Sequence, residues 1–195
     1  MPLLTTQSAR GYGFGTTIPA PPVVSDFESI QTINITNNST TVADFTSIPS
    51  TYRNLYLRVI MSGTSSAVEA WVSFNGDTTA GNYSRQIAYN SGTGAGSSFV
   101  QNSQAAGRSW LYSPDSTINY PYSFPVYNHY IIDYAQTNKY KSTWQDGYQF
   151  MDASYGAILM GSFLWSSTAA INRITFTCQS GAFAQNSQLA LFGLK

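Results

Sequence analysis

The sequence has few of the residues on which disulfide-stapled and metal-binding proteins depend. Among 195 residues there is one cysteine, Cys178, so the chain cannot close an intramolecular disulfide and does not resemble disulfide-rich secreted domains. There is also one histidine, and one His with one Cys is too few for the usual zinc site. In INRITFTCQ, Cys178 alternates with Ile174 and Phe176, so we expect a small buried residue rather than a nucleophile.

Charged residues are also scarce. They make up 9% of the chain, and nine Lys and Arg balance nine Asp and Glu, so the formal net charge is zero. A neutral chain without a basic run is not expected to bind nucleic acid, because that binding depends on neutralising phosphates. No apolar run reaches the ~18 residues of a membrane span, and the N-terminus lacks the apolar core of a signal peptide. We therefore expect a soluble protein, made in a cytoplasm, without a membrane partner.

Few side chains offer catalytic or metal-binding chemistry. His129 alternates with Asp133 along VYNHYIID, but residues four apart on a strand are separated by about 13 Å. Asp77 stands almost alone in FNGDT, where a turn is a better interpretation than a calcium site. Asp146 and Asp152 bracket DGYQFMD without forming a recognisable glycosidase pair. The sequence thus predicts no enzyme: no catalytic residue, no metal site and no cofactor.

What the sequence does contain is typical of an all-β protein. Aromatic residues reach 15%, with 14 Tyr and 11 Phe, and aromatic residues suit the half-buried surface of a sheet. Leu55, Leu57, Val59 and Met61 alternate as on a strand with one apolar face, and no stretch keeps helical spacing. With its frequent turn signals, residues 26–195 are predicted to form a single jelly-roll β-sandwich of about eight to ten antiparallel strands.

Nine runs carry this strand prediction. Two of them are expected to pair as a hairpin, VYNHYIIDYA and KYKSTWQDGY, joined at Gln136-Thr137-Asn138. The stretch 92–125 is polar and poorly periodic, and most of it is predicted to be a long loop. The nine runs are FESIQTINI, LYLRVIM, VEAWVSF, YSRQIAY, VYNHYIIDYA, KYKSTWQDGY, AILMGSFLW, INRITFTC and SQLALFGL.

A cluster of aromatic residues marks the end of this loop. Tyr and Trp suit interfaces because they combine a large contact area with a polar tip, and they also stack on sugars. Three interpretations stay open for the cluster: core plus a packed loop, a subunit or partner interface, or a carbohydrate platform. Its members are Trp110, Tyr112, Tyr120, Tyr122 and Phe124.

Residues 1–25, MPLLTTQSARGYGFGTTIPAPPVVS, read as an extended N-terminal arm. They have neither helical nor strand periodicity, and Pro19, Pro21 and Pro22 favour an extended exit. Such a segment cannot bury enough surface to fold alone, so we expect it to become ordered on a partner. The expected attachment residues are Leu3, Leu4, Arg10, Tyr12 and Phe14.

Several segments together resemble a family of tailed-bacteriophage virion proteins with a jelly-roll fold. The resemblance implies a structural virion component, either a head decoration (cement) protein or a tail-fibre type of module. It covers most of the chain but not 92–125. The segments are SIPSTYRNLYLRV, SFNGDTTAGNYSRQIAYN, IIDYAQTNKYKS, WSSTAAINRITFT and GAFAQNSQLALFGLK, and the PLLTTQSARGYGFG arm looks like the segment that precedes such domains.

From this resemblance we expect a capsid decoration protein that binds between capsomers on the outer surface of the head. Its partners would be the major capsid protein and two further copies in a homotrimer, with the arm as the attachment device. The alternative is a tail fibre or tail adaptor whose jelly roll binds a host glycan or another fibre.

Overall fold

The computed structural model describes most of the region predicted to fold. The predicted arm, 1–25, lies outside the described residues, as does much of the predicted loop. The described residues are 26–65, 69–90, 96–110, 124–150 and 156–195.

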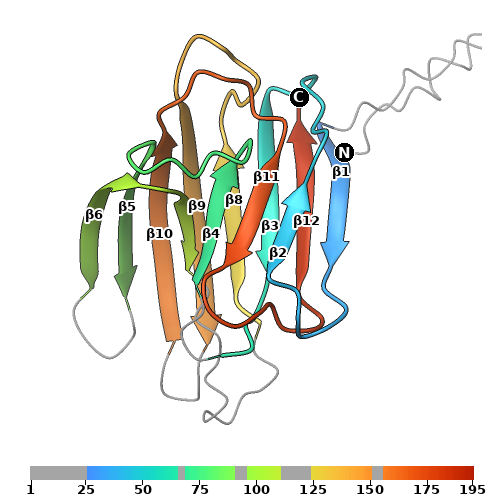
Figure 1. The fold of residues 1–195 in the computed structure, drawn as a ribbon, viewed down its shortest axis with the longest axis vertical. Helices are drawn as coiled ribbons and strands as arrows, with labels where there is room; N and C mark the ends of the chain where they lie inside the picture. Colours follow the sequence, from blue (N-terminus) through green and yellow to red (C-terminus); the bar gives the residue numbers. More distant parts are fainter. Residues whose placement is uncertain (1–25, 66–68, 91–95, 111–123, 151–155) are drawn as a thin grey trace, which may run out of the picture.

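Two antiparallel β-sheets pack face to face and contain twelve strands, without a helix in the described residues (Figure 1). The predicted all-β sandwich is confirmed, and its antiparallel sheets are compatible with a jelly roll. The eight-stranded sheet has the spatial order β1 (Phe27–Asn34), β12 (Gln188–Leu194), β3 (Asn54–Ile60), β8 (Val126–Ile131), β9 (Lys141–Phe150), β10 (Gly156–Trp165), β5 (Tyr83–Asn90) and β6 (Ser97–Gln104). The four-stranded sheet has the order β2 (Val42–Phe45), β11 (Ile174–Cys178), β4 (Glu69–Phe74) and β7 (Gly107–Trp110).

Three strands were missing from the predicted set, which is why the count exceeds eight to ten. β6 and β7 lie inside 92–125, so the loop prediction was wrong for that part. β6 is an edge strand with mostly exposed or half-exposed Ser, Asn and Gln side chains, which hides the alternation that reveals inner strands. β2 and β7 are four residues long each, too short for a periodic pattern to stand out.

The core lies between the sheets and is built from alternate residues of the central strands. Leu55, Leu57 and Val59 of β3 are fully buried, as their alternation predicted. Phe176 of β11 belongs to the same cluster from the opposite sheet. Cys178 is 8% exposed at the end of β11, which confirms the prediction of a small buried residue.

β8 and β9 form the predicted hairpin, but with a longer connection than the predicted turn at 136–138. The connection covers residues 132–140, and Asp133 adopts a left-handed φ of 50° in it. Tyr134 departs from the strand and fills the core, where it is fully buried and its hydroxyl donates to the Pro49 carbonyl. A tertiary contact, the burial of Tyr134, therefore ends the strand early.

Two glycines let aromatic rings lie directly against a strand backbone. Gly147 of β9 is paired with Tyr127 of β8, and a Cβ at Gly147 would come within 2.1 Å of the Tyr127 ring. Gly107 of β7 faces Phe163 of the opposite sheet, where an added Cβ would lie 2.6 Å from the ring. Because Cβ atoms do not approach carbon so closely, both glycines are required for the observed packing.

We predict that Gly147→Ala destabilises the fold by about 1–3 kcal/mol, because the buried Tyr127 ring must shift to admit a methyl group. Chemical denaturation monitored by tryptophan fluorescence measures this loss. Gly96→Ala is the matched control, since its added Cβ would meet its nearest neighbour, the Tyr89 carbonyl oxygen, at an ordinary 3.5 Å. The control should change stability by no more than about 0.5 kcal/mol. Equal stability of the two variants would contradict this account.

Candidate functional site

A row of aromatic rings crosses the outer face of the large sheet, which we define as the surface of the eight-stranded sheet opposite the core. Ring centroids of Phe27 and Phe192 are 5.0 Å apart, and Phe27 lies 5.3 Å from Tyr56. The row continues to Tyr130, 4.9 Å from Tyr56, and to Trp144, 5.4 Å from Tyr130. Strand register explains the order, because Tyr56 pairs with Tyr130 and Tyr130 with Trp144.

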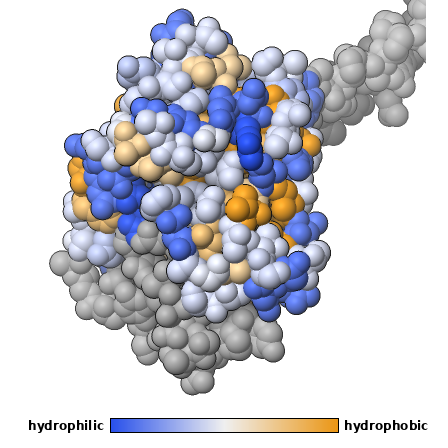
Figure 2. All heavy atoms as spheres, in the orientation of Figure 1, coloured by the Kyte–Doolittle hydropathy of each residue, from blue (hydrophilic) through white to orange (hydrophobic). Residues whose placement is uncertain are grey.

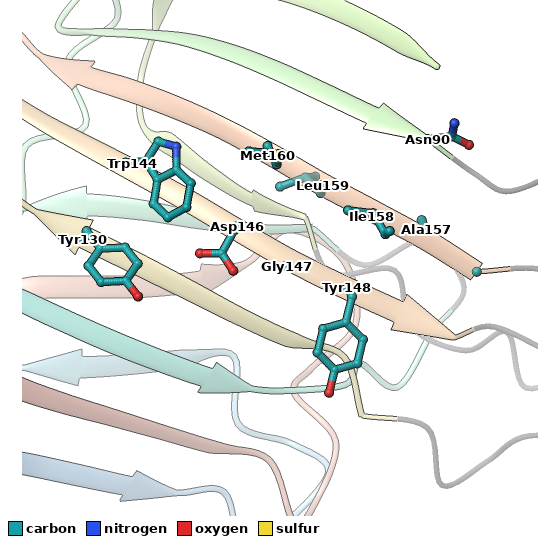
Figure 3. A pocket seen from close by; sticks show the side chains of 11 residues that line it. Asn90, Tyr130, Trp144, Asp146, Gly147, Tyr148, Ala157, Ile158, Leu159 and Met160 are labelled. Atoms are coloured by element: carbon teal, nitrogen blue, oxygen red, sulfur yellow. The ribbon is translucent and has the colours of Figure 1, made fainter. Parts of the chain in front are cut away.

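The row ends at a hollow of about 980 Å³ over β8, β9 and β10 (Figure 3). Large side chains around it are unusually exposed: Trp144 by 41%, Tyr148 by 52%, Ile158 by 65% and Met160 by 53%. Contiguous exposed apolar surface of this kind marks binding sites, whereas isolated exposed residues do not.

On the face seen in the orientation of Figure 1, apolar residues appear as separate patches between polar ones (Figure 2).

One carboxylate lies within this apolar surface. Asp146 projects from β9 between Trp144 and Tyr148 (Figure 3). Asn128 Nδ2 donates to Asp146 Oδ2 at 3.0 Å, and the Tyr56 hydroxyl donates to Asn128 Oδ1 at 2.7 Å. Burial is the main reason that the pKa of Tyr56 is raised, so this hydroxyl keeps its proton and its donor role. The chain of hydrogen bonds holds the Asp146 carboxylate in one orientation.

This site was not predicted from the sequence, although one signal for it exists. Trp144, Asp146 and Tyr148 alternate along β9, but large aromatic residues on a strand are normally assigned to the core. In β9, however, the residues between them face the core and are polar: Thr143 is 1% exposed and Gln145 is 2% exposed. Only the structure shows that the aromatic side of β9 faces outward.

The aromatic cluster predicted from the sequence is only partly described. Trp110 is the last residue of β7 in the four-stranded sheet, whereas Phe124 is half-buried just before β8 of the eight-stranded sheet. Trp110 therefore belongs to the four-stranded sheet, whereas Phe124 belongs to neither sheet and leads into the eight-stranded one. The remaining members and the five arm residues lie outside the described residues: Tyr112, Tyr120, Tyr122, Leu3, Leu4, Arg10, Tyr12 and Phe14.

Asp77 forms a turn, as predicted, and its carboxylate is occupied by hydrogen-bond donors. Oδ2 accepts from Trp165 Nε1 at 2.7 Å and from Asn82 Nδ2 at 2.8 Å, and Oδ1 accepts from the Thr79 amide at 2.9 Å. Burial by itself would raise the pKa of Asp77, but these hydrogen bonds outweigh it and lower the pKa to about 2. In the described residues, no three His, Cys, Asp or Glu side chains gather in a way that could hold a metal ion.

His129 is buried between the sheets and is 1% exposed. Its ring lies edge-on to Phe176 at 5.8 Å and to Phe163 at 6.5 Å. Asp133 is in the following turn rather than on the same strand, where it pairs with Lys139. Burial lowers the pKa of His129 to about 4, so the imidazole is neutral in the folded protein at neutral pH.

The described part of the chain contains no helix that is long and apolar enough to cross a membrane.

We predict that the folded state loses stability as the pH falls from about 6.5 to about 4. In this range the unfolded chain protonates His129 and the folded protein does not, which favours unfolding by about 3 kcal/mol. Urea denaturation at several pH values measures the loss, and His129→Gln should flatten it. Asp77 contributes to the loss of stability only below this pH range, because folding lowers its pKa from 3.8 to about 2. An unchanged slope in His129→Gln would show that another group is responsible.

No protein-family model, curated protein or solved structure matches the chain. The resemblance to phage virion proteins therefore stays a prediction from the sequence.

Proposed function

We propose that the chain is a structural component of a tailed-phage virion, acting as a decoration protein on the capsid surface. The sandwich is the rigid body, and residues 1–25 attach it to capsid subunits or to neighbouring copies in a homotrimer. The sequence segments described above support this proposal, as do the neutral charge and the two-sheet fold. Low net charge favours association because it removes the repulsion that keeps molecules apart.

The observation that carries the proposal is the anchoring of Asp26, Phe27 and Glu28, which directly follow residues 1–25. β1 follows the arm and pairs with β12 along the edge of the large sheet. Glu28 accepts a hydrogen bond from Tyr52 at 3.0 Å and forms an ion pair with Lys195, while the Lys195 amide donates to the Asp26 carbonyl at 3.2 Å. Phe27 is the first ring of the aromatic row and packs on Tyr56 and Phe192. These contacts fix the start of β1, from which the proposed arm would extend.

A fixed point matters because it limits where the arm can reach. Each arm contact is expected to be weak, but three arms on one trimer raise the overall affinity through effective concentration. A trimer that binds the assembled lattice, and not its separate subunits, stabilises that lattice by mass action. This is the mechanical role of a decoration protein.

A second candidate is a tail fibre or tail adaptor that recognises a host glycan or another fibre. The observation that favours it is the position of Asp146 between the exposed rings of Trp144 and Tyr148, which suits a polar ligand. The two candidates differ in position on the particle rather than in fold.

Copy number in purified virions tests the decoration role. A decoration protein repeats over the icosahedral lattice, so we expect on the order of hundreds of copies per particle. Quantitative mass spectrometry against the major capsid protein gives this ratio. A count of a few to a few tens would contradict decoration and favour the tail.

We predict that deleting residues 2–22 leaves a folded trimer that no longer attaches firmly to particles, because the sandwich keeps its core while the arm is lost. Light scattering reports the trimer, and co-sedimentation with particles lacking the native protein reports attachment. Replacing Leu3, Leu4, Tyr12 and Phe14 together with Ser retains the chain length and should weaken attachment as well. Undiminished attachment of both variants would contradict the role of the arm.

A further inference from the structure

We propose that the hollow on the outer face binds a neutral oligosaccharide of about two or three pyranose rings. Trp144 and Tyr148 would stack on the sugar rings, and Asp146 would accept hydrogen bonds from their hydroxyl groups. This inference deepens the second candidate above, on which it rests, by naming the ligand class of the same surface, and it is independent of the decoration role.

The spacing on β9 suits such a ligand. Trp144, Asp146 and Tyr148 are alternate residues of one strand, so their side chains project from the same side of the sheet (Figure 3). At about 3.4 Å per residue, the two aromatic residues are about 14 Å apart, with the carboxylate midway. An extended oligosaccharide can place the apolar C–H side of one sugar on each ring and its hydroxyl groups at the carboxylate.

β10 supplies an apolar wall beside this line of residues. Met160 pairs with Asp146 and Ile158 pairs with Tyr148 in the β9–β10 register. Both side chains are more than half exposed, and both line the hollow. Its volume of about 980 Å³ lies at the upper end of the range for small-molecule sites, about 300–1,000 Å³.

The Asp146 carboxylate is already oriented to accept hydrogen bonds from hydroxyl groups. Asn128 holds its Oδ2 at 3.0 Å, and Tyr56 in turn fixes Asn128. A carboxylate has about four acceptor positions, so one bond from Asn128 leaves capacity for a sugar. Hydrogen bonds to an ionised acceptor are stronger than neutral ones, and a group already fixed loses little entropy on binding.

The same carboxylate argues against other classes of ligand. A dry protein interface over this surface would bury an ionised Asp146 among aromatic rings, which is costly unless a cation pairs with it. Phosphate groups and acidic sugars would meet like charge. Arg58 lies on this face two strands away, with about 10 Å between its backbone and that of Asp146, and the ion pairs of the described residues do not join the two side chains.

The test titrates the full-length protein with three neutral trisaccharides, chitotriose, maltotriose and cellotriose, and with acidic sialyllactose. Calorimetry and amide chemical shifts in NMR report binding. We expect saturable binding of at least one neutral trisaccharide and at least tenfold weaker binding of sialyllactose. Trp144→Ala and Tyr148→Ala should each lower the affinity for the neutral trisaccharide at least tenfold. Asp146→Asn, which is nearly isosteric, should also lower the affinity for the neutral trisaccharide and should reduce the discrimination against sialyllactose.

Trp71→Ala is the matched control. Trp71 is 36% exposed on β4 of the other sheet, so its loss should leave saccharide binding unchanged. Thermal denaturation establishes that each variant is folded. The proposal is overturned if none of the neutral trisaccharides binds saturably, or if binding survives in Trp144→Ala, Tyr148→Ala and Asp146→Asn. Virion copy number is measured separately, so failure here leaves the decoration role to its own test.

Discussion

One partly exposed turn, Phe74–Asp77, joins the two sheets through hydrogen bonds. The turn follows β4 of the small sheet, and its carboxylate binds the indole of Trp165 at the end of β10 in the large sheet. The Tyr83 hydroxyl of β5 donates to the Asp77 carbonyl at 3.1 Å and accepts from the Phe74 amide of β4 at 2.9 Å. Hydrogen bonds to a charged acceptor in such surroundings are strong and directional, so the turn fixes β4 relative to β5 and β10.

The outer face depends on this arrangement through the register of β9 and β10. Trp165 pairs with Lys141, and the same antiparallel ladder continues to Ile158, which pairs with Tyr148. A shift of one residue would turn every side chain of a strand to the other face. The bond to Asp77 therefore holds β10 at one end of this ladder, and the β9–β10 register determines which side chains meet in the hollow near the other end.

β9 is oriented against the usual preference of its side chains. Lys141 is fully buried, and its ammonium group donates to the carbonyls of Lys139 and Thr168 at 2.9 and 3.2 Å. Thr143 and Gln145 are also buried, while Trp144 and Tyr148 face outward. Burying polar groups and exposing aromatic ones both cost stability. Such conflicts between local preference and fold are expected mainly at functional sites, which supports the outer face as a binding surface.

The sequence alone determined the all-β class, the strongly alternating strands such as β3, the burial of Cys178 and the turn at Asp77. These follow from local patterns, because alternation and turn residues act within a few positions of the chain. The tertiary structure decided the polar edge strand β6, the early end of β8 at Tyr134, and the outward side of β9. Each of these depends on which surface another part of the chain covers. Alternation along β9 places Trp144, Asp146 and Tyr148 on one side of the strand, and only the packing of one sheet on the other decides that this side faces outward.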